Sequence, residues 1–144
     1  MVDLVFLTQT DTTIGFVSQN RQKLDAIKKR PAHKYYIKAV DSLSTLKRLD
    51  RVPTKHKNRI RRAIKSTFIL PSGYSYRVIK DMHHLELISK LKWAYTTSAN
   101  LSGEGYDEKW ARNIADNTIE PLGQNDNAPS EIYIINNKTI KKLR

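Results

Sequence analysis

Side chains able to do chemistry gather in three polar clusters, and the first directly follows an apolar run near the N-terminus. The segment TQTDTTIGF, residues 8–16, offers four threonine hydroxyls and the carboxylate of Asp11. Side chains at the end of a buried strand often line a ligand crevice in α/β proteins, because a rigid sheet holds the loops there. A turn held by threonine or aspartate side chains is the plainer interpretation. The residues alone leave both open.

The second cluster is IKKRPAHK, residues 27–34, where Lys28 and Arg30 stand just before the helix-ending Pro31. Once the chain leaves the helix, both cations could converge on one anion. A guanidinium can clamp a phosphate with two hydrogen bonds while an ammonium supplies a compact charge, so the pair suits a polyphosphate. Each such bond contributes about 1.5–3 kcal/mol when shielded from water, whereas an exposed pair contributes almost nothing.

The third cluster is TTSANLSG, residues 96–103, where an apolar run breaks into small polar side chains. Ser98 and Asn100 alternate along an extended segment, so they could face the same way. A hydroxyl and an amide together can recognise phosphate oxygens or the edge of a base. The alternative is a simple turn leading to Gly103.

Other mechanisms are not indicated. The chain has no G-x-x-x-x-G-K-[ST] loop, no G-x-G-x-x-G fingerprint and no H-E-x-x-H motif, which are the signatures of common nucleotide and zinc sites. It has no cysteine and only four scattered histidines, so we predict no protein metal site. An acidic third residue without a basic leader argues against a signal peptide. We therefore expect a soluble, cytoplasmic protein without a membrane segment.

Positive charge is concentrated in two runs. The formal net charge is +12, with seven Lys or Arg against one Asp in residues 21–38 and nine against one in residues 47–65. Such a charge steers anions to the surface, and phosphates are the anions we expect. The second run fits a solvated helix face and a binding surface equally well.

Strand and helix patterns alternate from end to end without a linker or repeat, so residues 1–144 are predicted to form one α/β domain. Asn20 is expected to cap one helix, Asp41 or Ser42 a second, and Pro53 to open a basic third reaching about Lys65. Two further helices are expected at 82–91 and 107–116. Strands are expected at 3–8, 14–17, 34–40, 66–70, 74–79 and 93–97, and a hairpin at 131–144.

In this order, TQTDTTIGF, IKKRPAHKYYIKAV, STFIL, YRV, TTSANLSG and PSEIYIINNKTIKKLR resemble the YrdC/TsaC family of threonylcarbamoyl-AMP synthases. The resemblance covers nearly the whole chain, and its most specific elements are K-x-R-P at 28–31 and S-A-N-x-S-G at 98–103. It implies a short, diverged member with a YrdC-like twisted, open, mixed sheet flanked by helices and a basic concave face.

The activity that the resemblance implies is a nucleotidyl transfer. L-Threonine, bicarbonate and ATP would give threonylcarbamoyl-AMP and pyrophosphate, and partner proteins would transfer the product to tRNA to form t6A beside the anticodon. Mg2+ would accompany the ATP. The resemblance assigns catalysis and nucleotide binding to Lys28, Arg30, Ser98 and Asn100, further phosphate contacts to Arg77 and Ser130, and threonine contacts to Thr10 and Thr12.

The chain departs from the family pattern at several positions. Gln9 stands where a proline is usual, Ile14 stands where an aromatic residue is usual, and the basic RRAIKSTFIL replaces a P-G-P turn. The alternative is therefore a catalytically degenerate YrdC-like protein that binds tRNA or double-stranded RNA. Its RNA-binding residues would be Lys55, Lys57, Arg59, Arg61, Arg62 and Lys65.

Overall fold

The computed structural model describes residues 3–29, 35–101, 103–123 and 130–144. The strands are β1 (Phe6–Gln9), β2 (Ile14–Ser18), β3 (Ile37–Val40), β4 (Ser66–Ile69), β5 (Ser75–Val78), β6 (Trp93–Ser98), β7 (Asn117–Thr118), β8 (Glu131–Ile135) and β9 (Ile140–Lys142). The helices are α1 (Arg21–Lys28), α2 (Leu43–Leu49), the 3₁₀ turn η1 (Thr54–His56), α3 (Lys57–Arg62), α4 (Met82–Leu91) and α5 (Glu108–Ile114).

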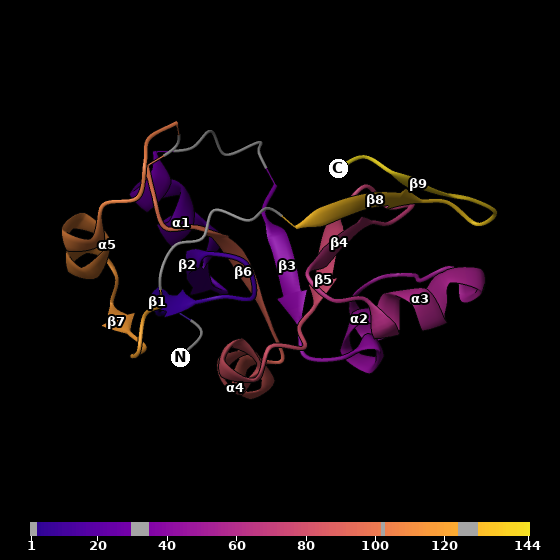
Figure 1. The fold of residues 1–144 in the computed structure, drawn as a ribbon, viewed down its shortest axis with the longest axis horizontal. Coiled ribbons are helices and arrows are strands. Elements are labelled where there is room, and N and C mark those ends of the chain that lie inside the picture. The colour runs from indigo at the N-terminus through magenta and orange to yellow at the C-terminus, as the bar shows by residue number, and fades with distance from the viewer. Residues whose placement is uncertain (1–2, 30–34, 102, 124–129) are drawn as a thin grey trace.

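All nine strands form one mixed sheet in the order β7-β1-β2-β6-β3-β5-β4-β8-β9 (Figure 1). The β1–β7, β3–β5 and β4–β8 pairs are parallel, and the other neighbours are antiparallel. The β4–β5 hairpin and the β8–β9 hairpin confirm two predicted pairings. The chain therefore has the single-domain α/β architecture that the sequence predicts.

The register of β3, β5 and β6 divides the sheet into two faces. Ala39 lies opposite both Arg77 and Ala94, and successive residues of a strand point to opposite sides. Arg77, Ala94 and Ser98 therefore share one face, which α4 covers in part through Leu87, Ile88 and Leu91. We call this the α4 face.

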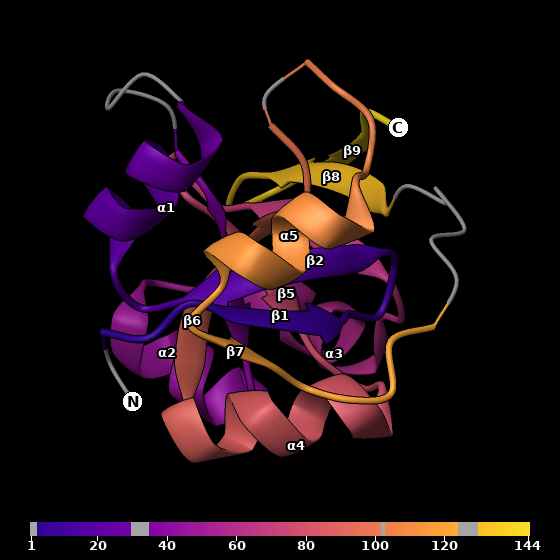
Figure 2. The same cartoon turned by 90° about the vertical axis from the view of Figure 1, so that its left-hand side faces the viewer.

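The other face, the helix face, carries two separate apolar cores. One is built where α1 and α5 pack on β1 and β2, and Phe16 meets Trp110 edge-to-face at 5.7 Å between ring centroids. The second forms where α2 and α3 pack on β3, β4 and β5, around Leu46, Ile60 and Phe68. Burying each large aliphatic side chain stabilises the fold by about 1.5–3 kcal/mol. Figure 2 shows α5 lying over β2, with α4 below β1.

Side-chain caps start the helices where the sequence predicts them. Asn20 accepts from the Lys23 backbone N–H, and Ser42 accepts from that of Thr45. Asp81 and Asp107 cap α4 and α5 in the same way. Each cap satisfies a backbone donor that the helix itself leaves unpaired, worth about 1 kcal/mol.

Two elements differ from the prediction. The expected helix from Pro53 to Lys65 is a short 3₁₀ turn followed by α3, which ends at Arg62 because Ala63 is extended and Lys65 is left-handed, with φ 51°. The two-residue strand β7 was not predicted, since it pairs with β1 from more than a hundred residues away. No helix in the described ranges is long and apolar enough to cross a membrane.

Candidate functional site

The β1–β2 turn is organised by one threonine hydroxyl. Thr10 Oγ1 accepts from the backbone N–H groups of Thr12 and Thr13 at 3.3 and 3.2 Å, and donates to the Thr13 carbonyl at 2.5 Å. Thr10 thus forms the threonine turn that the sequence left as its plainer interpretation. Position 15 requires glycine, because a Cβ there would lie 2.8 Å from the Thr97 carbonyl oxygen and 3.1 Å from Thr10 Cγ2.

The turn directs Asp11 and Thr12 toward Arg77 on β5. Arg77 Nη1 donates to Asp11 Oδ1 at 2.9 Å and to Thr12 Oγ1 at 3.5 Å. Its Nε and Nη2 donate to Thr67 Oγ1 at 3.2 and 3.0 Å, and Nη2 also donates to Ser130 Oγ at 2.9 Å. We call these five residues the Arg77 cluster. A guanidinium has five N–H donors, and the five contacts above give each of them an acceptor.

The Arg77 cluster is closed to solvent. Thr12, at 8%, is its most exposed member, and Arg77 itself is 5% exposed. The cluster ties the β1–β2 turn, β4, β5 and the residue before β8 into one network. A ligand anion could reach the guanidinium only by displacing Asp11 or one of the hydroxyls. Arg77 as a phosphate ligand therefore stays a prediction, and sequence reasoning missed its pairing with Asp11.

His84 of α4 lies beneath this cluster. The His84 side chain is fully buried, with Nδ1 3.9 Å from Asp11 Oδ1. Neither ring nitrogen has a hydrogen-bond partner among the described residues. Burial lowers the pKa of His84 to about 4, although the Asp11 carboxylate opposes this shift. The imidazole is therefore neutral near pH 7.

A second cluster joins the end of α1 to the end of β6. Lys28 Nζ donates to the Ser98 carbonyl oxygen at 2.8 Å and to Asn100 Oδ1 at 3.3 Å. Ser98 Oγ donates to the same Asn100 Oδ1 at 2.5 Å. The structure thus brings together three of the predicted site residues, which we call the Lys28 cluster. The fourth, Arg30, lies outside the described residues.

Asn100 is held by the loop that follows it. Its Nδ2 donates to the carbonyl oxygens of Leu101 and Glu104 at 2.9 and 2.5 Å. These contacts fix the amide so that Oδ1 points toward Ser98 and Lys28. Lys28 is only 4% exposed, whereas Ser98 is exposed. The Lys28 cluster therefore combines a buried ammonium with an exposed hydroxyl.

The Ser98 side chain of the Lys28 cluster points to the same face of the sheet as Arg77, while Lys28 reaches the Ser98 carbonyl from α1 at the end of the strand. Gly15, against which Thr10 packs, is opposite Ser98 in the register, and Thr12 contacts Arg77. A cavity of about 170 Å³ adjoins Ser98 and Asn100, and Ile14 lines it. This cavity alone is smaller than the pockets that usually hold small molecules, which occupy about 300–1,000 Å³.

Gln9, at the position where the resemblance leads us to expect a proline, makes two polar contacts. Its Oε1 accepts from the Gly123 backbone N–H at 3.1 Å, and its Nε2 donates to the Thr10 carbonyl at 3.2 Å. Gln9 thus fastens the segment after β7 to the edge of the β1–β2 turn.

No metal centre is evident among the residues that the structure describes, since they contain no group of three candidate ligands. The carboxylate of the Arg77 cluster belongs to Asp11, which is paired with the guanidinium. Mg2+ is commonly carried by substrate phosphates with few protein ligands. These residues therefore fit an ion that arrives with a nucleotide better than a resident one.

The predicted RNA-binding residues lie elsewhere. Those on η1 and α3 contact the β8–β9 hairpin, where Lys55 Nζ donates to the Lys138 carbonyl at 2.9 Å and Arg59 lies 5.1 Å from the Tyr133 ring centroid. Lys57 is partly buried, and the rest are exposed, namely Lys55, Arg59, Arg61, Arg62 and Lys65. Since α3 packs on the helix face, this basic surface is separate from the Arg77 cluster on the α4 face.

No protein-family model matches the chain. A curated relative, the uncharacterized protein MG259 of Mycoplasma genitalium, is 27% identical over an alignment of 156 positions, which covers 95% of this chain. The chain spans about a third of that protein's length, 32%.

Solved structures share the fold. Sua5 of P. abyssi, in a crystal structure with L-threonine, superposes with a TM-score of 0.83 at 18% identity over 98% of this chain and 50% of Sua5. YciO of E. coli superposes with a TM-score of 0.70 at 17% identity over 99% of this chain and 82% of YciO. The chain therefore has the YrdC-like fold that its motifs predict.

Proposed function

We propose that the chain is an L-threonylcarbamoyl-AMP synthase, which acts on L-threonine, bicarbonate and ATP. The observation that carries this proposal is the Lys28 cluster, where an ammonium, a hydroxyl and an amide from segments seventy residues apart meet at one strand end. The resemblance assigns these same residues to the nucleotide. The likeness to Sua5, which has been solved with L-threonine, supports the amino-acid substrate.

The reaction that we propose has two stages. The threonine amine attacks bicarbonate and gives a carbamate with loss of water. A carbamate oxygen then attacks the α-phosphorus of ATP, and pyrophosphate leaves. Both stages gather negative charge without needing a protein nucleophile, so binding geometry and positive charge would do most of the catalysis.

The described residues could supply both the positive charge and the binding geometry. Lys28 would neutralise the phosphates, while the Ser98 hydroxyl and the fixed Asn100 amide would orient them. Arg30 would add a second cation. Mg2+ would arrive with ATP and stabilise the charge of the phosphates. Arg77 would act by holding Thr12, Asp11 and Ser130 in place around the substrate.

The β1–β2 turn carries the two residues that we propose for binding of the L-threonine substrate. Thr10 is committed to the backbone of that turn, whereas the Thr12 hydroxyl has only long contacts, at 3.5 Å, with Thr10 Oγ1 and Arg77. Of the two threonines that the resemblance assigns to L-threonine, Thr12 is therefore better placed for direct contact. Thr10 would act by shaping the turn.

Pyrophosphate release in the presence of L-threonine, bicarbonate, Mg2+ and ATP tests the proposal. We expect threonine-dependent release that drops by about 10²–10³ in Asn100→Ala, the usual cost of removing one positioned donor, and that is abolished in Lys28→Ala. Lys23→Ala is the matched control, because Lys23 is exposed on the same helix and pairs with Asp116 instead. A folded protein that releases no pyrophosphate with threonine would refute the synthase proposal.

A second candidate function, binding of tRNA or double-stranded RNA, is favoured by the exposed cations of α3. Binding to phosphates releases counterions, so affinity should fall steeply with salt. If RNA binding persists in Asn100→Ala but is lost when Arg59, Arg61 and Arg62 are neutralised together, this surface binds RNA independently of the Lys28 cluster. Under the synthase proposal, the partners would be the proteins that transfer the product to tRNA.

A further inference from the structure

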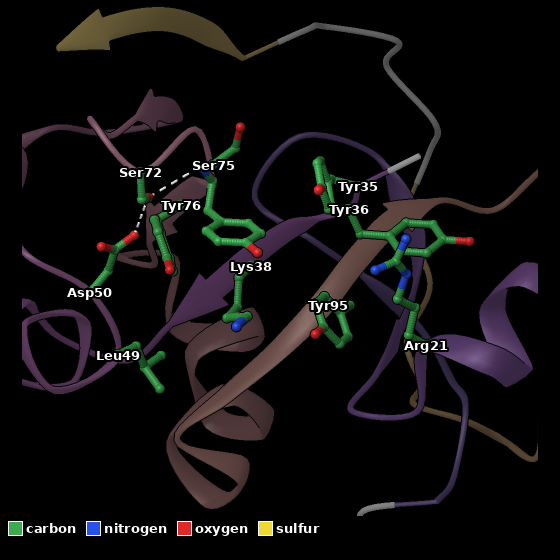
Figure 3. Close-up of a pocket in the computed structure, with 11 residues that line it drawn as sticks. Arg21, Tyr35, Tyr36, Lys38, Leu49, Asp50, Ser72, Ser75, Tyr76 and Tyr95 are labelled. Atoms are coloured by element: carbon green, nitrogen blue, oxygen red, sulfur yellow. Dashed lines mark hydrogen bonds between the residues drawn. The ribbon is translucent and has the colours of Figure 1, made fainter. Parts of the chain in front are cut away.

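A larger cavity lies on the helix face, between the two apolar cores. Its volume is about 350 Å³, within the range of about 300–1,000 Å³ typical of small-molecule sites. Five tyrosines surround Lys38 in this tyrosine pocket, which takes its walls from α1, the segment before β3, the end of α2 and the β4–β5 hairpin. Figure 3 shows Lys38 between Tyr76 and Tyr95, its neighbours in the register.

The pocket is separate from the Lys28 and Arg77 clusters. Tyr76 precedes Arg77 on β5, and Tyr95 differs from Ser98 by an odd number of positions on β6. Because strand residues alternate between faces, the pocket opens on the helix face, whereas the Arg77 and Ser98 side chains point to the α4 face. The pocket also shares no lining residue with the cavity beside Ser98 and Asn100. A ligand here would therefore be additional to those of the proposed synthase reaction.

The floor of the pocket is a half-buried cation. Lys38 Nζ lies 4.7 Å from the Trp93 ring centroid, 5.3 Å from that of Tyr95 and 5.9 Å from that of Tyr76. Within the described ranges, no carboxylate oxygen forms an ion pair with this ammonium. Burial lowers the pKa of Lys38, partly opposed by the charge of Asp50. An incoming anion would find a cation that aromatic faces already orient.

The rim of the pocket presents exposed aromatic rings. Tyr35 is 59% exposed and Tyr74 is 49% exposed, and their rings meet edge-to-face at 5.3 Å between centroids. The Arg21 guanidinium lies over the Tyr35 ring at 5.5 Å. Aromatic rings combined with cations are a common platform for bases, because every base has a flat π-face that stacks on them.

The carboxylate that lines the pocket, Asp50, already accepts hydrogen bonds. Asp50 Oδ2 accepts from Ser72 Oγ at 2.5 Å, and Oδ1 accepts from the Arg51 backbone N–H at 2.7 Å. Burial first, and then a hydrogen bond with Asp50, raises the pKa of Tyr76. The charged groups lining the pocket are Arg21, Lys38 and Asp50, and Arg21 also pairs with Asp25 at 3.9 Å. Lys38 is therefore the lining cation without an ion-pair partner among the described residues. A cationic ligand would be repelled by Lys38, which already occupies the aromatic faces.

We propose that the tyrosine pocket binds a nucleoside monophosphate, with the phosphate facing Lys38 and Arg21 and the base stacked on the Tyr74 ring beside Tyr35. The base requires the exposed rings, and the phosphate requires the buried ammonium. This group could come from a free mononucleotide or from the phosphorylated 5′ end of an RNA strand. The two sources share their chemistry and differ in what continues beyond the ribose.

NMR titration of the ¹⁵N-labelled protein with adenosine 5′-monophosphate tests this site. The titration is made in Asn100→Ala, so that the Lys28 cluster is impaired and the tyrosine pocket is intact. We expect shifts at residues 35–38, 72–76 and 95, and about tenfold or more weaker binding of adenosine or of inorganic phosphate alone. Phosphorylated and dephosphorylated oligoadenylates then distinguish the sources: tighter binding of the 5′-phosphorylated strand than of the mononucleotide identifies an RNA end.

Two variants examine the two halves of the pocket. Lys38→Met keeps the aliphatic stem and should weaken mononucleotide binding about tenfold to a hundredfold. Tyr74→Ala changes only an exposed ring and should weaken it about fivefold or more. Lys90→Met, exposed on α4, is the control.

Shifts confined to residues 98–106 would overturn the proposal, and so would unchanged affinity in folded Tyr74→Ala. Threonine-dependent pyrophosphate release should survive in Lys38→Met, so this proposal and the synthase proposal can fail separately.

Discussion

The Lys28 and Arg77 clusters are both built around a buried cation, yet they differ in what surrounds it. The Arg77 guanidinium has a carboxylate partner, an acceptor for each N–H and no member more than 8% exposed. The contacts described for Lys28 are a carbonyl and an amide oxygen, and they lead to the exposed Ser98. The difference in exposure indicates that the Arg77 cluster is internal to the fold, whereas the Lys28 cluster has a hydroxyl that a ligand can reach.

Removing Arg77 should have the largest effect on stability. Arg77→Met leaves the Asp11 carboxylate buried without its partner, which typically costs about 3–5 kcal/mol in the free energy of unfolding. Urea denaturation followed by circular dichroism measures this loss, with the exposed Arg59→Met as the control. A loss below about 1 kcal/mol would show that Arg77 is not a structural clamp, and the comparison with Lys28 would then fail.

Acid should weaken the same region through His84. The folded pKa of His84 is about 4, below the ordinary value of 6.5, so the unfolded chain binds this proton more readily. The free energy of unfolding is therefore not reduced by this group above about pH 6.5. It falls as the pH drops toward 4, by up to about 3 kcal/mol. The difference in unfolding free energy between pH 7 and pH 4.5 should shrink in His84→Leu. An equal pH dependence in His84→Leu and the native chain would contradict this account.

The β1–β2 turn should show a smaller effect that separates its two threonines. Thr10→Val removes the acceptor of two backbone N–H groups and should cost about 1–3 kcal/mol in stability. Thr12→Val, whose hydroxyl makes only long contacts, should cost less but should raise the KM for threonine under the synthase proposal. Thermal denaturation and initial-rate kinetics measure the pair. The reverse order of stabilities would exchange the roles of the two threonines.

Ser98→Ala should have the smallest effect on stability. The hydroxyl is exposed and donates one hydrogen bond to Asn100, so we expect a loss of about 0.5 kcal/mol. Pyrophosphate release should nevertheless fall by about 10²–10³ if this hydroxyl contacts the nucleotide. A large loss of stability with normal kinetics would place the Lys28 cluster in the same structural class as the Arg77 cluster.

Local chemistry made much of the molecule predictable. Asn20 as a helix cap and the turn between β4 and β5 follow from short segments. Ser98 and Asn100 do meet, but through a bend in which the Asn100 N–H donates to the Ser98 carbonyl, and not along an extended segment. The approach of Lys28 to these residues could not be derived from its own segment, and the resemblance supplied it.

The missed features all depend on long-range register. The Asp11–Arg77 pair spans 66 residues, and the packing of His84 beneath it requires α4 to cover the correct face. The tyrosine pocket requires β3 to lie between β5 and β6. Because a shift of one residue turns each side chain to the opposite face, no single segment of the sequence contains this information.

The position of β6 in the sheet has a consequence for biosynthesis. β1 and β2 can pair as a hairpin as soon as they leave the ribosome, but the strand that covers the other edge of β2 ends at Ser98, eighty residues after β2 ends. At a synthesis rate of about 5–20 residues per second, that edge stays open for roughly 4–16 s. Its unpaired N–H and C=O groups could pair with another chain during that interval. The nascent protein would then depend most on chaperones before β6 is made.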